Sequence, residues 1–267
     1  MTLRLWLPLA VVMAWVAAAL AAPLLPLDGD AIRLHLILQG PGGMGLLGFD
    51  DLGRPLADRL LLGARTSLMV AVSVVVISIV VGTAFGVSAA WMGGAWDHVM
   101  VRIIDIFLAF PGILLAIALA GILGPGIDNV VVALAAVGWV GFARLARAQA
   151  LSIKHREHVQ AAVALGTRPP VIILRHLLPL LAAPLIVEAT FALAGIVIAE
   201  AGLSFLGLGV QPPAPSWGAM IRDGTRYVLV APHLVLVPGI ALMLVVFAVN
   251  LLGDRLRDRL DVRYRPA

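Results

Sequence analysis

The sequence predicts an all-α polytopic membrane protein with about six transmembrane helices. Of its 267 residues, 61% are hydrophobic and only 13% are charged, whereas a soluble domain carries about 25% charged residues. Mean hydropathy is +1.04. Several apolar stretches approach the roughly 20 residues that a helix needs to cross a bilayer. These three properties exclude a soluble globular domain.

The first apolar stretch, Leu5–Ala22, follows Arg4. A cleavable signal peptide would fit this position, but a run of about 18 residues exceeds the usual signal core and just spans a bilayer, so we expect a retained helix. The segment from Pro23 to about Arg65 is polar and rich in turns. We interpret it as external, ending in a short amphipathic helix near Leu56–Leu62. Residues 1–66 thus form an N-terminal unit, and 67–267 the transmembrane core.

Five further spans follow in order. Gly82, Gly86 and Ala90 lie at four-residue spacing, which predicts a helix face that a neighbouring helix can approach closely. Pro111 predicts a bend within the third span. The predicted spans are Leu68–Trp91, Arg102–Leu123, Val130–Ala148, Ala183–Phe205 and His233–Leu252.

Basic residues are distributed unequally between the two sides of this topology. The proposed inner segments carry Arg4, Arg102, Arg144, Arg147, Lys154, Arg156, Arg168, Arg175, Arg255, Arg257, Arg259, Arg263 and Arg265. The outer segments carry Arg33, Arg54, Arg59, Arg65, Arg222 and Arg226. The positive-inside rule therefore places both termini in the cytoplasm. The same distribution explains the pI near 10.6 by membrane topology, without nucleic acid as a partner.

A polar loop, 154–179, separates the fourth and fifth spans on the cytoplasmic side. Alanines among good helix formers predict a short helix over Arg156–Leu165. Gly166 supplies its end, because glycine tolerates a left-handed backbone. A second short helix is expected over about Pro169–Leu178, closing at Pro179. An ordinary amphipathic loop helix at the membrane surface is the simpler alternative.

Several ordered motifs favour a more specific interpretation. Gln160-Ala161-Ala162, Gly166 and Leu178-Pro179 resemble the "EAA" loop in the membrane subunits of ABC importers. Further motifs resemble the dipeptide, oligopeptide and nickel permease family, as a second, C-type, binding-protein-dependent subunit: Phe49–Arg54 (FDDLGR), Gly63–Leu68 (GARTSL), Phe110–Gly112 (FPG), Ala201–Gly209 (AGLSFLGLG), Pro215–Gly218 (PSWG) and Asn250–Asp254 (NLLGD).

This resemblance implies a multi-pass inner-membrane protein whose loop forms a coupling helix docked on an ATP-hydrolysing subunit. The implied partners are a second homologous permease subunit, two ATP-binding subunits that hold ATP-Mg, an extracytoplasmic solute-binding protein and membrane lipid. The implied coupling residues are Gln160, Ala161, Ala162, Leu165, Gly166 and Pro179. Gln160 stands where the loop usually has glutamate, and His176, Phe49 and Pro55 also depart from the family pattern.

The chain offers little for catalysis. A phosphate-binding loop needs a glycine-rich turn that ends in Lys and Ser or Thr, and the only lysine, Lys154, lacks that context. There is no cysteine. His155 and His158 lack a third ligand, so a solvated basic face is the better interpretation. We therefore expect no enzymatic activity, cofactor or metal in this chain.

Ionisable residues inside a bilayer are costly and invite a functional hypothesis. We expect Arg102 and Asp105 to form a local pair. Glu188 and Glu200 lie about 120° apart on the fifth span and cannot share one site. Glu200 either faces the pathway, holds the segment 202–209, or bonds to neighbouring backbone. The external loop, Gly207 to about Ala231, presents Trp217, which by resemblance faces the outer vestibule or else belongs to a simple turn.

The function that follows is a permease subunit of an ATP-driven importer, forming half of a pathway for di- and oligopeptides. Import of nickel or another small solute is the alternative within the same mechanism. An ion-coupled secondary transporter would instead need carboxylates that converge at the midplane. A channel or scaffold has no specific feature in its favour.

Overall fold

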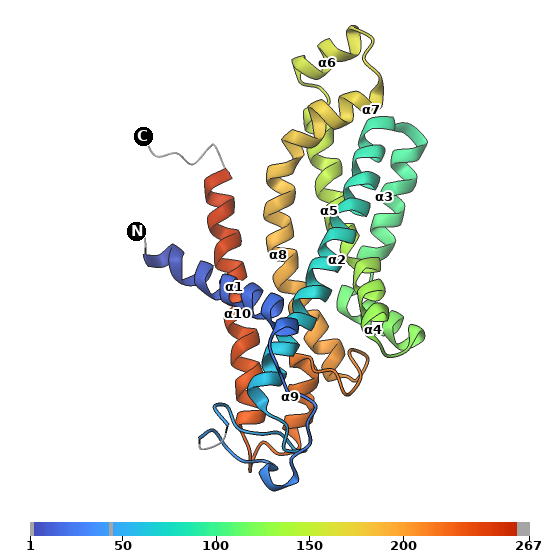
Figure 1. Cartoon of the computed structure of the whole chain (residues 1–267). Helices are drawn as coiled ribbons and strands as arrows, with labels where there is room; N and C mark the ends of the chain where they lie inside the picture. The colour runs from blue at the N-terminus through green and yellow to red at the C-terminus, as the bar shows by residue number, and fades with distance from the viewer. Residues whose placement is uncertain (1–2, 43–44, 261–267) are drawn as a thin grey trace.

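The computed structural model describes residues 3–42 and 45–260, and all of their regular structure is helical. The long elements form one elongated bundle (Figure 1). They are α1 (Leu3–Ala21), α2 (Leu56–Met92), α3 (Gly94–Leu108), α4 (Gly112–Leu123), α5 (Ile127–Ile153), α8 (Leu178–Phe205) and α10 (His233–Leu260). The short ones are η1 (Ala22–Leu24), η2 (Leu34–Leu36), α6 (Glu157–Ala164), α7 (Pro169–Ile172), π-helical η3 (Ile173–Leu177) and α9 (Trp217–Thr225). We call the two ends of the bundle the α6 end and the α9 end.

The prediction of about six spans is confirmed. Five helical segments in the described residues are long and apolar enough to cross a membrane, and the pair α3 and α4 makes a sixth if counted as one bent span. The bend is 86°, at the break that contains Pro111. A residue before proline is disfavoured in a helix, so α3 ends at Leu108 and α4 begins after Pro111.

Helix α2 is longer than the sequence analysis predicted. The expected short helix near Leu56–Leu62 and the expected span Leu68–Trp91 form one continuous helix of 37 residues. Gly63 lies inside this helix and has a packing role, because a Cβ there would lie 2.9 Å from Trp217 Cδ1. At 1.5 Å per residue α2 is about 55 Å long, more than a bilayer core requires.

The chain also continues through Pro179, where a helix end was predicted. Residues 169–205 form one helical segment, so the fifth span begins before Ala183. Proline lacks the N–H for a helical bond. The π-helical turn η3 precedes it, with Leu178 N donating to Ile173 O, and Pro179 thus falls in the first turn of α8. Two other boundaries differ: α9 lies within the expected external loop, and α10 extends to Leu260.

Helices α2 and α5 approach each other at the small-residue face that the sequence predicted. A Cβ at Gly82 would overlap the carbonyl oxygen of Trp139, and one at Gly86 would overlap that of Ala143. Ala90, on the same face, is fully buried. This backbone contact holds the two central helices of the bundle together.

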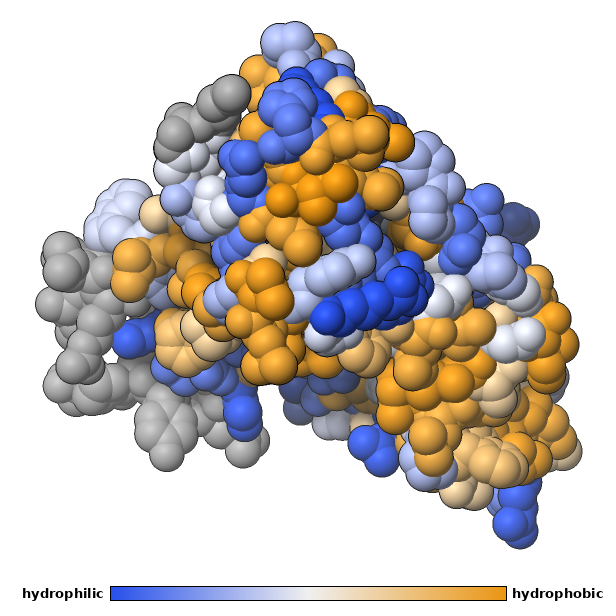
Figure 2. Space-filling model, turned by 90° about the horizontal axis from the view of Figure 1, so that it is seen from below, coloured by the Kyte–Doolittle hydropathy of each residue, from blue (hydrophilic) through white to orange (hydrophobic). Residues whose placement is uncertain are grey.

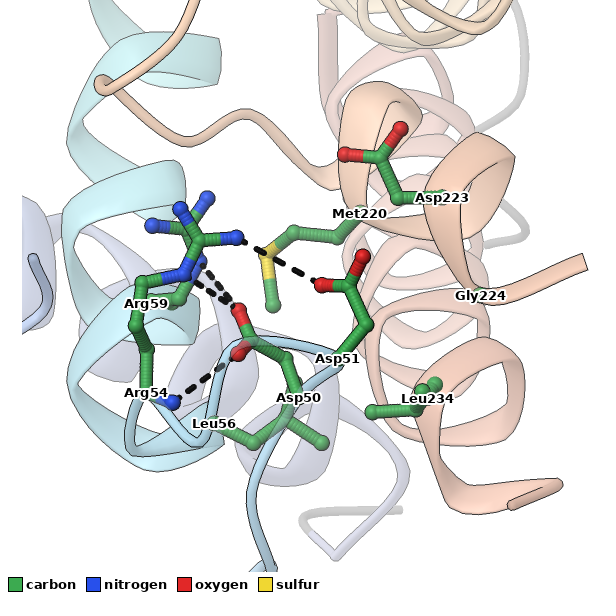
Figure 3. A pocket seen from close by; sticks show the side chains of 9 residues that line it. All are labelled: Asp50, Asp51, Arg54, Leu56, Arg59, Met220, Asp223, Gly224 and Leu234. Atoms are coloured by element: carbon green, nitrogen blue, oxygen red, sulfur yellow. Dashed lines mark hydrogen bonds and ion pairs between the residues drawn. The ribbon is translucent and has the colours of Figure 1, made fainter. Parts of the chain in front are cut away.

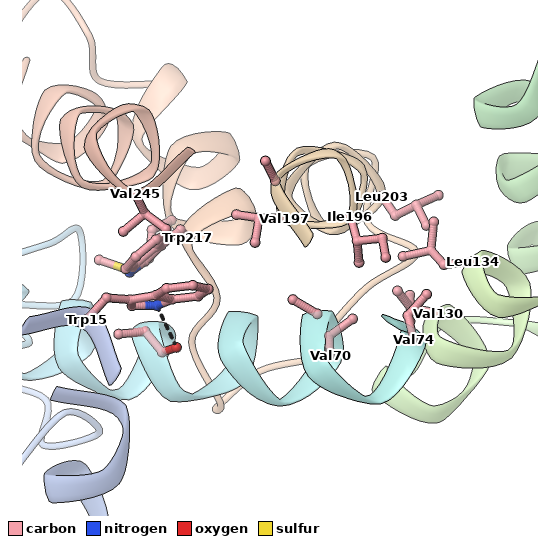
Figure 4. Packing of buried hydrophobic residues seen from close by; sticks show 14 of the residues in the cluster. Trp15, Val70, Val74, Val130, Leu134, Ile196, Val197, Leu203, Trp217 and Val245 are labelled. Carbon is pink, nitrogen blue, oxygen red and sulfur yellow. Dashed lines mark hydrogen bonds between the residues drawn. The ribbon is translucent and has the colours of Figure 1, made fainter. Parts of the chain in front are cut away.

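The core near the α9 end is organised around two tryptophans (Figure 4). Trp15 Nε1 donates to Ala64 O at 3.2 Å, and Trp217 Nε1 donates to Leu60 O at 3.0 Å. The ring centroids are 6.3 Å apart. Both indoles therefore lie against α2, and they join α1 and α9 to it. Val245 lies beside them, and the cluster continues through Val197 to Val70, Val74, Val130, Leu134, Ile196 and Leu203.

A buried ion cluster fixes the segment before α2 to the same end (Figure 3). Asp50 Oδ2 lies 2.7 Å from Arg54 Nε and 3.4 Å from Arg59 Nε. Arg59 Nη1 also donates to Gly29 O at 3.0 Å. The Asp50 and Arg59 side chains are only 10% and 7% exposed. Burial, reinforced by the charge of Asp50, raises the pKa of the neighbouring Asp51 carboxyl. The surface seen from the α9 end mixes hydrophilic with hydrophobic residues (Figure 2).

We predict that Arg59→Leu destabilises the protein strongly. It leaves the buried Asp50 carboxylate with one cation fewer and Gly29 O without its donor, and removing one partner of a buried ion pair costs about 3–5 kcal/mol. The matched control is Arg33→Leu, since Arg33 pairs with Asp28 at 2.9 Å with both side chains exposed, an arrangement worth about 0–1 kcal/mol. Thermal unfolding of the purified full-length chain in detergent measures both. Equal shifts for the two variants would contradict the prediction.

Candidate functional site

The loop between α5 and α8, residues 154–179, extends beyond the membrane bundle at the α6 end (Figure 1). It contains the helix–turn–helix that the sequence predicted. The first helix is α6, and the second begins with α7 at Pro169. Proline is accepted in this first turn because its missing N–H loses no helical bond.

The turn after α6 depends on Gly166, whose φ is +74°. Gly166 N donates to Val163 O at 2.9 Å, and Thr167 N donates to Ala162 O at 3.0 Å. These two bonds make a Schellman motif, which satisfies carbonyls that the end of a helix leaves free. Nothing lies within 4 Å of the position that a Gly166 Cβ would take. Backbone conformation, and not crowding, therefore explains the glycine.

The inner face of α6 packs against the bundle. Val159 is fully buried and Ala162 is 7% exposed. They belong to one apolar cluster with Ile153 of α5, Ile172 of α7 and Leu177 of η3, which continues into α2 and α8. A hydrogen bond also joins the loop to α2, because Lys154 Nζ donates to Ala90 O at 2.7 Å. The loop is therefore a packed extension of the membrane helices.

The opposite face of α6 is exposed in the part of the chain that the structure describes. Gln160, Ala161 and Gly166 are exposed, and Leu165 is 85% exposed. Ala162, which the sequence analysis placed with them, turns its side chain inward, so it supports the helix from below. Pro179 is exposed but lies in α8, away from α6 along the chain. The predicted coupling residues thus fall into three groups. The exposed face of α6 and its turn carry Gln160, Ala161, Leu165 and Gly166. Ala162 packs beneath the helix, and Pro179 lies at the start of α8.

Beside α6 lies an open groove of about 410 Å³, lined by Trp91, Lys154, His155, Gln160, Val163 and Ala164. His176, the departure from the family pattern, lies in η3 with its ring centroid 6.1 Å from that of His158 in α6. His155 and His158 are both exposed. Among the described residues, no group of three or more His, Cys, Asp or Glu side chains could hold a metal ion.

A bidentate ion pair ties α3 to α5 below this loop. Arg147 Nε and Nη2 lie 2.6 and 2.7 Å from the two carboxylate oxygens of Asp97. The expected local pair of Arg102 and Asp105 was wrong, since no ion pair joins them in the part of the chain that the structure describes. Sequence reasoning missed the Asp97–Arg147 pair because 50 residues separate its members.

Glu200 lies at the other end of α8 and is 1% exposed. Its carboxylate accepts hydrogen bonds from Ser67 Oγ at 3.0 Å and Ser204 Oγ at 2.7 Å. It thereby joins α2 to the start of the segment 202–209, where Gly209 packs directly on Ser204. Trp217 is likewise buried, at 2% exposure. Glu200 and Trp217, the two candidates for a pathway or gate role, thus both form buried contacts within this chain.

Comparison with known proteins was made at three levels. A family model described as the inner membrane component of binding-protein-dependent transport systems matches residues 82–266. The chain is 41% identical, over 96% of its length, to the dipeptide transport system permease protein DppC of Alkalihalophilus pseudofirmus, of which it covers 85%. It is 40% identical, over 91% of its length, to the glutathione transport system permease protein GsiD of Pectobacterium atrosepticum, of which it covers 81%.

Among solved structures, an inward-facing conformation of the MetNI methionine ABC transporter matches with a TM-score of 0.62 at 20% identity. That match covers 75% of this chain and 95% of the other, and it shows a shared fold. The family match and the relatives agree with the motifs that the sequence presents. The chain therefore belongs to the family of inner membrane components of binding-protein-dependent transport systems.

Proposed function

We propose that this chain is one of two permease subunits of an ATP-driven importer, and that the solutes it imports are di- and oligopeptides. The observation that carries the proposal is the α6 loop, which is packed on three membrane helices on one side and exposes Leu165 on the other. The relatives named for dipeptide and glutathione transport support a peptide as the solute. Nickel or another small solute is the alternative within the same mechanism.

The α6 helix, on this proposal, docks on an ATP-binding subunit in the cytoplasm. Gln160, Ala161, Leu165 and Gly166 supply the contact surface, and ATP-Mg is bound by the partner. Closure of two such subunits on ATP moves the loop, and the apolar cluster under Val159 transmits the movement to the bundle. ATP binding thus biases a bundle with two arrangements, inward and outward open.

The other proposed partners are a second permease subunit and a solute-binding protein. A second homologous permease completes the pathway, and the solute-binding protein delivers the solute at the α9 end. Both termini lie on the cytoplasmic side with α6, as the distribution of arginine and lysine favours. Residues 67–267 form the core domain and 1–66 an N-terminal addition. Helix α2 crosses that boundary and joins the two parts.

The first test is uptake of a labelled dipeptide and of labelled nickel by cells with and without this chain, before and after ATP depletion. We expect loss of the chain, or of ATP, to abolish dipeptide uptake and leave nickel uptake unchanged. Loss of nickel uptake alone would identify nickel as the solute and leave the proposed coupling to ATP unchanged. Uptake that needs the chain and survives ATP depletion would overturn the coupling proposal.

The second test addresses the turn after α6. A β-branched side chain is strained at a φ of +74°, at a cost of about 1–3 kcal/mol. Gly166→Val should therefore lower ATP-dependent uptake at least about tenfold while the chain remains in the membrane. Gly166→Asn is the matched control, because asparagine tolerates the left-handed region, and it should keep most of the uptake. Normal uptake with valine would show that the turn is not needed for coupling.

A further inference from the structure

One intramembrane carboxylate has no role in the contacts described so far. Glu188 lies on α8, which belongs to a membrane-spanning segment, and is half-buried. Its Oε1 lies 3.6 Å from the position that a Cβ would take on Gly141 of α5. Among residues 3–42 and 45–260, no hydrogen bond or ion pair reaches this carboxylate. Glu200, on the same helix, is by contrast fully satisfied by two serines.

A carboxylate without a partner is not stable against lipid. Charged side chains within transmembrane segments face a bundle interior or a water-filled cavity, because hydrocarbon cannot solvate them. The side of α8 that carries Glu188 must therefore be covered by water or by polar groups in the working transporter. Lipid alone is an unfavourable neighbour for the ionised carboxylate.

Toward the α9 end, the side of α8 that carries Glu188 also carries two exposed glycines. Gly195 and Gly202 follow Glu188 at seven-residue spacing, which places all three near one face of a helix. Both glycines are exposed, and a Cβ on either would meet nothing within 4 Å. On the α5 side, Gly141 has no side chain to cover the carboxylate. The two glycines leave the backbone of α8 uncovered on this face, and Ile198, 52% exposed, borders it.

We propose that Glu188 lines the translocation pathway and binds the ammonium group of the peptide in transit; this rests on the proposed function. Peptides differ in their side chains, but a free amino terminus gives each one a cation. A carboxylate can hold that cation by a charge-assisted hydrogen bond whatever the sequence. A single contact with no second protein partner is also weak enough to release the solute, as conduction requires.

Accessibility can be tested directly because the chain has no cysteine. Glu188→Cys and Ile186→Cys are compared in the assembled transporter with a membrane-impermeant, cationic methanethiosulfonate. Ile186 is 49% exposed and lies on the opposite side of α8. We expect the cysteine at 188 to be modified and a saturating dipeptide to slow its modification at least about threefold. The cysteine at 186 should stay unmodified. No modification at 188, or modification that dipeptide does not slow, would overturn the proposal.

Uptake by proteoliposomes that contain the whole transporter and its binding protein tests the charge. Glu188→Gln should lower labelled dipeptide uptake per ATP hydrolysed at least about tenfold, and Glu188→Asp should keep about a third or more. The control is Asp128→Asn, which removes an exposed carboxylate in the first turn of α5 and should match wild type. If wild type transports no dipeptide, the proposed function fails. If Glu188→Gln equals wild type, or if it prevents assembly of the subunits, only the role of Glu188 fails.

Discussion

The apolar cluster beneath α6 joins the loop 154–179 to the membrane helices. Val159, fully buried, lies in one cluster with residues of α2, α5, α7, η3 and α8. A loop attached only at its ends could move without moving the bundle. Here the short helix and the long ones share a packed interior, and close-packed interiors transmit displacement and do not absorb it. The membrane helices and the exposed face of α6 therefore form one mechanical unit.

The two ends of the molecule are held by different means, and α2 connects them. Near the α6 end, glycine-mediated contact of α2 with α5 and the bond from Lys154 to Ala90 O keep the central helices in register. At the α9 end, the same helix supplies the carbonyls that both tryptophans bond and the Arg59 of the ion cluster. A single helix of 37 residues thus carries both sets of contacts. A displacement at α6 can therefore reach the α9 end through this helix.

Much of this architecture can be predicted from the sequence, because bilayer thickness and local backbone chemistry act over short distances. The spans, the turn at Gly166 and the small face of Gly82 and Gly86 are of this kind. What escaped prediction depends on contacts distant in the chain. Asp97 meets Arg147 only once α3 packs on α5, Gly63 is tolerated within α2 because Trp217 occupies the space beside it, and the inward direction of Ala162 depends on the cluster below it. The π-helical turn before Pro179 has no pattern in composition or periodicity.

We propose that the exposed face of α6 contacts an ATP-binding subunit. A photo-crosslinking amino acid placed at Leu165 in the whole transporter tests it most directly. The control position is Leu229, which is 96% exposed and follows α9. We expect adducts between this chain and the ATP-binding subunits from position 165 only, with a yield that changes when ATP is added. No adduct from position 165, or equal adducts from both positions, would contradict it.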